Sequence, residues 1–65
     1  MNLLQFTETI DMGEFLVSAV HENKKVTFVS IYPIVDSIVY PPLYMDEEAM
    51  IPLVKMIESK LSSME

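Results

Sequence analysis

The sequence predicts an α+β domain, in which an antiparallel meander of three to four short strands is followed by one C-terminal amphipathic helix packed on one sheet face. Two observations lead to this prediction. Residues 14–32 contain two runs rich in valine, phenylalanine and isoleucine around a polar centre, which is typical of a β-hairpin. Residues 46–63 instead carry apolar side chains at helical spacing.

The first strand is predicted over residues 3–10. Leu4 and Phe6 alternate with more polar residues, as on one face of a half-buried strand, and the threonines between them favour an extended backbone. A short helix over residues 2–10 is the alternative, because the apolar residues there also fit helical spacing. Gly13 is the only glycine, so we expect it where positive φ or a tight turn is needed.

The second and third strands are predicted over residues 14–22 and 25–32, joined by a two-residue turn at Asn23-Lys24. This turn places Glu22 opposite Lys25, a cross-strand pair of opposite charge that supports the register. Because Asn-Lys is not the preferred turn dipeptide, a longer loop with a shifted register is the alternative.

Counting outward from this turn predicts apolar side chains on both faces of the hairpin. One face can pack on the helix. The other face carries Leu16, Val20, Val29 and Ile31. A sheet with one wet face should alternate between apolar and polar residues. We therefore predict that this second face, or its adjoining edge, mediates self-association or binds another protein.

The chain is predicted to leave the sheet after the third strand and to return only briefly. Pro33 has no N–H to donate to a strand ladder, so it marks a strand end, an edge or a bulge. Asp36-Ser37 is polar and can turn the chain into a short strand over residues 37–40. Pro41-Pro42 then ends this strand and leads to the helix through an extended loop.

The helix is predicted over residues 46–63, with Asp46 as its N-cap. Its apolar stripe comprises Met50, Leu53, Val54, Ile57, Leu61 and Met64. Met56 falls off the stripe, so we expect it to be exposed or at an interface. Pro52 conflicts with an uninterrupted helix, and predicts either a kink or a helix that begins near it.

The composition favours association. A chain of 65 residues is expected to form one domain, residues 1–65, with a core of marginal stability. It has no cysteine, which excludes disulfides and thiolate metal sites. It is 51% hydrophobic yet carries a formal net charge of −6. We therefore predict a homodimer, a complex with another protein, or both.

Several function classes are disfavoured. The four basic residues are all lysines, so the arginine-containing basic stripe of a nucleic-acid binder is lacking. His21 is the only histidine, without a second histidine or a cysteine to share a metal, and is expected at the surface or at a strand edge. No triad spacing and no glycine-rich phosphate loop occur. We expect no catalytic residue, no cofactor and no metal.

A membrane location is not expected either. Residues 26–44 are long enough to span a bilayer, but three prolines and Asp36 interrupt them. The first ten residues lack the positive charge of a signal peptide. The sequence predicts a cytoplasmic protein.

Residues 40–44 read Tyr-Pro-Pro-Leu-Tyr. The last four resemble the Pro-Pro-x-Tyr ligands of WW domains, and the first four are similar to a docking motif of some viral late domains. The resemblance covers these five residues only. It implies that Tyr40, Pro41, Pro42 and Tyr44 dock in an aromatic-lined groove. The alternative is structural, a rigid connection with both tyrosines packed on the core edge.

The sequence thus favours a small acidic protein-binding module without enzymatic activity, a regulator or inhibitor that occupies another protein's surface. Phage and mobile-element regulators are similar in size and charge. Two alternatives stay open. The chain is either a carrier of the docking motif in residues 40–44 or a non-catalytic structural subunit of a larger complex.

Overall fold

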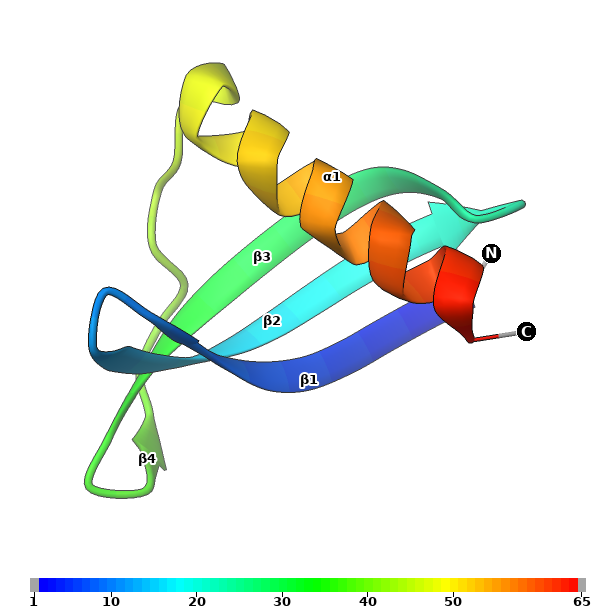
Figure 1. Ribbon diagram of the computed structural model, residues 1–65. Coiled ribbons are helices and arrows are strands. Elements are labelled where there is room, and N and C mark those ends of the chain that lie inside the picture. Colours follow the sequence, from blue (N-terminus) through cyan, green and yellow to red (C-terminus); the bar gives the residue numbers. More distant parts are fainter. Residues whose placement is uncertain (1, 65) are drawn as a thin grey trace.

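A computed structural model describes residues 2–64 of the protein. It confirms the α+β prediction, because a curled four-stranded antiparallel meander is followed by one helix. The elements are β1 (Asn2–Ile10), β2 (Gly13–Glu22), β3 (Lys25–Val35), β4 (Ile38–Val39) and α1 (Glu47–Ser63). Figure 1 shows α1 lying diagonally across one face of the sheet.

Tight two-residue turns connect the four strands. In each turn both central residues have positive φ, the pattern that matches the twist of antiparallel strands. These residues are Asp11 and Met12, Asn23 and Lys24, and Asp36 and Ser37. The predicted turn at Asn23-Lys24 is confirmed, as is the pairing of Glu22 with Lys25. The turn predicted at Asp36-Ser37 is confirmed as well.

Gly13 closes a tight turn, one of the two roles predicted for it, but it does not have positive φ, because Asp11 and Met12 occupy the positive-φ positions. Gly13 instead begins β2, opposite Ile10. A Cβ atom at this position would lie 3.1 Å from a ring carbon of Phe15. Close packing of the Phe15 ring, rather than backbone conformation, therefore explains the glycine.

The core lies between α1 and the two central strands. It comprises Val17, Ala19, Val29, Ile31, Ile57 and Leu61. None of these side chains is more than 5% exposed. Leu4 and Phe6 pack against the core from β1, which confirms the strand over the helical alternative at the start of the chain. Each fully buried aliphatic side chain contributes about 1.5–3 kcal/mol.

The register of the β2–β3 hairpin is shifted by a β-bulge at Thr27. His21 pairs with Val26, whereas Val20 pairs with Phe28, so Thr27 has no residue opposite it. The Thr27 hydroxyl donates a hydrogen bond to the carbonyl of Val20 at 3.1 Å. Beyond the bulge every pair is one residue away from the predicted register, and a slip of one residue moves each side chain to the other face.

Pro33 lies within β3, so the predicted end of the third strand at residue 32 was wrong. The carbonyl of Pro33 accepts a hydrogen bond from the N–H of Tyr40 at 2.8 Å, on the side of β3 away from β2. In a strand the N and C=O of one residue point the same way. The Pro33 nitrogen therefore faces the sheet edge, where no donor is required, in agreement with the edge position that proline favours.

The helix begins as predicted and runs without a break. The Asp46 carboxylate accepts a hydrogen bond from the N–H of Ala49 at 2.9 Å, which confirms the N-cap. Pro52 lies inside α1, so the helix does not start near it, although Pro52 cannot donate to the carbonyl of Glu48. Further along, the Glu58 carboxylate accepts a hydrogen bond from the N–H of Val26 at 2.9 Å and ties α1 to β3.

Candidate protein-binding surface

The four aliphatic residues predicted to form an interface do not share a face. Val29 and Ile31 are each 5% exposed and lie in the core beneath α1. Leu16 and Val20 are half-buried and pair with Tyr32 and Phe28 on the opposite face. The prediction of one common face was wrong because the bulge at Thr27 shifts β3 by one residue relative to β2.

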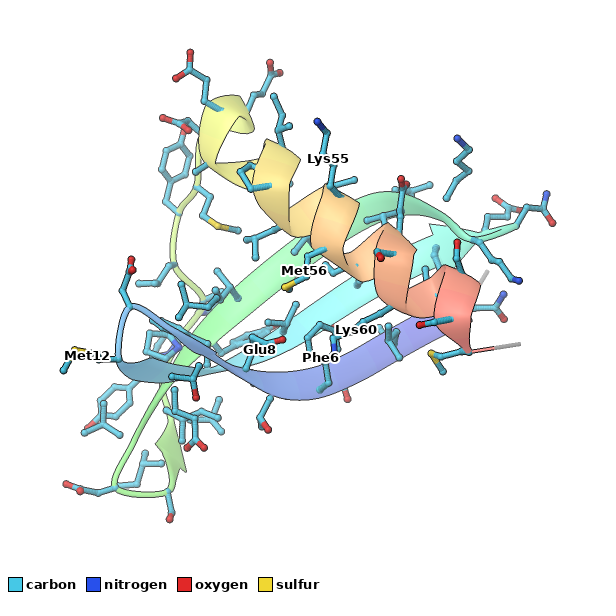
Figure 2. The ribbon with its side chains drawn as sticks, in the orientation of Figure 1. Phe6, Glu8, Met12, Lys55, Met56 and Lys60 are labelled. Carbon is cyan, nitrogen blue, oxygen red and sulfur yellow. The ribbon has the colours of Figure 1, made fainter. Side chains whose placement is uncertain are left out.

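Two methionines near the end of the chain differ from their predicted exposure. Met56, expected to be exposed or at an interface, is half-buried and packs against the core. Figure 2 shows its side chain on the side of α1 that faces the sheet. Met64, expected on the apolar stripe, is 66% exposed. The buried side of the helix is therefore broader in its middle than the predicted stripe, and it ends at Leu61 rather than at Met64.

The segment of residues 40–46 runs beside β3 without forming a strand or helix of its own. Besides the bond from Tyr40, the N–H of Leu43 donates to the carbonyl of Ile31 at 2.9 Å. These bonds hold the backbone in place. Met45 packs against the core, whereas both tyrosines are exposed. Tyr44 is 93% exposed and Tyr40 is 46% exposed. The expectation that both tyrosines pack on the core edge is wrong for Tyr44.

An open groove of about 400 Å³ lies between β3 and this segment. Its lining residues come from β3, the segment and the start of α1. They are Phe28, Val29, Ser30, Pro42, Leu43, Tyr44, Met45 and Met50. Phe28 is 60% exposed, although sequence patterning offered no reason to select it. The shifted register brings it to the surface beside Leu43 and Tyr44.

A second open groove, of about 420 Å³, runs along one flank of α1 and adjoins the first. The two share Met50 in their walls. The second is lined by apolar side chains that include the half-exposed Ile51, with Glu47, Lys55 and Glu58 at its rim. Together, Phe28, Leu43, Tyr44 and Ile51 form an exposed apolar surface around Met50. We call these four residues the apolar surface.

Acidic residues border the apolar surface at the start of α1. Asp46 caps the helix, and Glu47 and Glu48 lie in its first turn. All three are exposed. They stabilise the helix through its dipole, and they also place negative charge beside exposed apolar side chains. A surface of this composition is complementary to a partner that presents apolar and basic groups.

The β3–β4 hairpin adds further exposed apolar side chains at the same edge of the sheet. Val35, Ile38 and Val39 are each more than half exposed. Figure 1 shows this hairpin extending away from the helix. These three residues and the apolar surface lie along the same edge of the sheet, and exposed apolar surface of this kind is the usual mark of an interaction site.

His21 lies at the bulge and is half-buried, although a surface or edge position was expected for it. Its Nδ1 atom is buried and has no hydrogen-bond partner among residues 2–64. Over the same residues, no group of three histidine, cysteine or acidic side chains is placed to hold a metal ion.

Comparison with protein-family models, with curated proteins and with solved structures found no match for this chain. The helix that the structure describes is too short and too polar to cross a membrane. What the chain does must therefore be inferred from its surface.

Proposed function

We propose that this chain is a non-enzymatic protein-binding module, which regulates or inhibits another protein by covering part of that protein's surface. One observation supports the proposal above the others. Tyr44 is 93% exposed on a segment whose backbone is held by hydrogen bonds to β3. A large aromatic side chain on a fixed backbone loses little entropy on binding, which is a property of interface anchors.

The charge of the chain indicates the chemistry of the partner. The formal net charge is −6, and Asp46, Glu47 and Glu48 lie beside the apolar surface. We infer that the partner presents an apolar pocket with basic residues at its rim. Such complementarity mainly accelerates association, so the on-rate should fall as salt rises.

Replacing Tyr44 with alanine is expected to abolish capture of the partner. The test compares affinity pull-downs from source cells using the wild type, Tyr44→Ala and Met64→Ala. Met64 is an exposed methionine at the opposite end of α1 and serves as the matched control. Truncating an anchor typically costs at least about 2 kcal/mol of binding free energy, or roughly thirtyfold in Kd.

The captured protein is then purified and titrated against all three chains at two salt concentrations. Unchanged affinity of Tyr44→Ala would exclude the apolar surface as the binding site. Equal weakening by Met64→Ala would point to a general loss of fold rather than to a specific contact. Circular dichroism of each variant separates these two outcomes.

The docking-motif function is the second candidate, and the exposure of Tyr44 favours it. Pro41 and Pro42 are exposed as well, and the segment is extended. A Pro-Pro-x-Tyr ligand needs its prolines and tyrosine, whereas the residue between them is free to vary. Leu43 occupies that free position and also lines the groove beside β3.

The two functions therefore predict opposite results at Leu43. As a docking motif, the protein binds a purified WW domain, loses binding with Pro42→Ala and keeps it with Leu43→Ala. As a surface-covering module, it loses affinity for its partner with Leu43→Ala, because Leu43 is 49% exposed within the apolar surface. Titration calorimetry with both variants distinguishes them, and no heat with any WW domain would exclude the motif.

A further inference from the structure

Among residues 2–64, no backbone segment pairs with the outer edge of β1. β1 is the first strand in the sheet order and pairs only with β2. Its nine residues pair with β2 in one unbroken register, without a bulge. Figure 1 shows β1 at the edge of the sheet opposite β4. This edge is thus separate from the apolar surface, which adjoins β3.

The hydrogen bonds from residues 40–44 to β3 fix which way the backbone groups of each strand point. Ile31 and Pro33 direct their carbonyl oxygens away from β2. Their partners on β2, Val17 and Phe15, are therefore not hydrogen-bonded to β3 and direct their N–H and C=O groups toward β1.

On β1, the residues opposite Val17 and Phe15 are Phe6 and Glu8, which therefore bond to β2. The alternate residues of β1 direct their backbone groups outward. These residues are Leu3, Gln5, Thr7 and Thr9. Their side chains are exposed, and no backbone hydrogen bond is made on their outer side within residues 2–64. They form a row of free donors and acceptors.

β1 lacks most of the features that prevent an edge strand from pairing with another chain, such as lysine, proline and bulges. Between Asn2 and Ile10 there is no lysine, no arginine and no proline. The single charge is Glu8, which lies on the face toward the helix and is half-buried. A long, regular edge of this kind is a template for another strand.

We propose that β1 pairs antiparallel with β1 of a second copy of this chain, about a two-fold axis beside Phe6. Gln5 then lies opposite Thr7 of the second copy, and Leu3 lies opposite Thr9. Each of these pairs exchanges both backbone hydrogen bonds. The contact is self-complementary and closed, so it gives a dimer with one continuous sheet rather than a filament.

The side chains around the axis support this register. Phe6 of each copy faces its equivalent, and Lys60 lies above the Phe6 ring with its Nζ 4.8 Å from the ring centroid. Figure 2 shows Phe6, Glu8 and Lys60 on the same side of β1. Glu8 of the second copy is diagonal to Phe6, at about 7–8 Å. In the dimer, the positive charge of Lys60 would therefore lie near the Glu8 carboxylate of the second copy, whose negative charge would otherwise oppose pairing.

The first test exploits the predicted pairing of residue 5 with residue 7. The double variant Gln5→Lys/Thr7→Lys places like charges opposite each other, and Gln5→Lys/Thr7→Glu places opposite charges there. The overall net charge would favour the opposite order of dimer stability. The first variant is less negative, so its two copies repel each other less, whereas the second variant remains at −6. At low salt we expect the lysine–glutamate variant to dimerise about tenfold more tightly.

Analytical ultracentrifugation over a dilution series measures both variants and the wild type, with circular dichroism as the check on folding. A wild type that stays monomeric throughout would overturn the proposal. Equal dimer constants for the two double variants would overturn it as well. Neither outcome affects the partner-binding function, because Tyr44 and the other residues of the apolar surface are unchanged.

The second test fixes the register by disulfide formation. The chain has no cysteine, so in each single variant the introduced cysteine is the only thiol that can form a disulfide. Gln5→Cys mixed with Thr7→Cys should form a mixed disulfide under mild oxidation, because paired residues of this type have Cα atoms about 5.5 Å apart. Each variant alone should not cross-link, since its two cysteines are diagonal. Cross-linking of Gln5→Cys alone would instead place the axis at Gln5 and refute the proposed register.

Discussion

Val29→Glu is expected to unfold the protein. Val29 is 5% exposed and packs with Val17, Ala19 and Ile31 beneath α1. A carboxylate there would be buried without a partner, which costs on the order of 4 kcal/mol or more. A chain of this length is stable by roughly 3–10 kcal/mol. We therefore expect loss of the native circular dichroism spectrum at 25 °C.

Phe28→Glu is the matched control, because Phe28 is the neighbouring residue, on the open face, and is 60% exposed. It should fold with a stability within about 0.5 kcal/mol of the wild type, as expected for a surface substitution. Urea unfolding of both variants makes the comparison. If Val29→Glu folded as well as Phe28→Glu, the register that places Val29 in the core would be wrong.

Ile57→Ala is expected to lower the free energy of unfolding by about 2–5 kcal/mol. Ile57 is fully buried and, with Leu61, is one of the two residues that α1 contributes to the core. Losing three carbon atoms leaves a cavity that a single layer of helix on a sheet cannot easily close. For a domain of this size the loss corresponds to a fall in Tm of roughly 10–40 °C.

Ile51→Ala removes the same atoms from the exposed side of the same helix and should change Tm by only a few degrees. Thermal unfolding is followed at one protein concentration for all variants, because dimerisation would make Tm depend on concentration. A small effect of Ile57→Ala, similar to that of Ile51→Ala, would show that α1 is not anchored on the sheet as the structure has it.

These variants also separate stability from binding. Phe28 and Ile51 belong to the apolar surface, so their substitutions should weaken partner binding while the fold is retained. Val29 and Ile57 lie in the core, so their substitutions should reduce every activity through loss of fold. Comparing the surface variants with the core variants therefore distinguishes a loss of binding from a loss of stability.

The sequence by itself determined the elements and their order. Alternation of apolar residues specified the strands, helical spacing specified α1, and Asp46 fixed the beginning of that helix. The polar pairs Asn23-Lys24 and Asp36-Ser37 located two of the turns. These features depend on local chemistry, on propensity, capping and periodicity, and each is contained in a few neighbouring residues.

Only the tertiary structure decided which side chains share a face. One extra residue at Thr27 exchanges the core and surface sides of β3, and its position depends on how β3 packs against β2 and α1 rather than on local propensity. The same packing holds residues 40–44 against β3 by their backbone and leaves Tyr44 in solvent. The apolar surface could therefore not be recognised from the sequence, because its residues come from three separate segments that meet only in the folded chain.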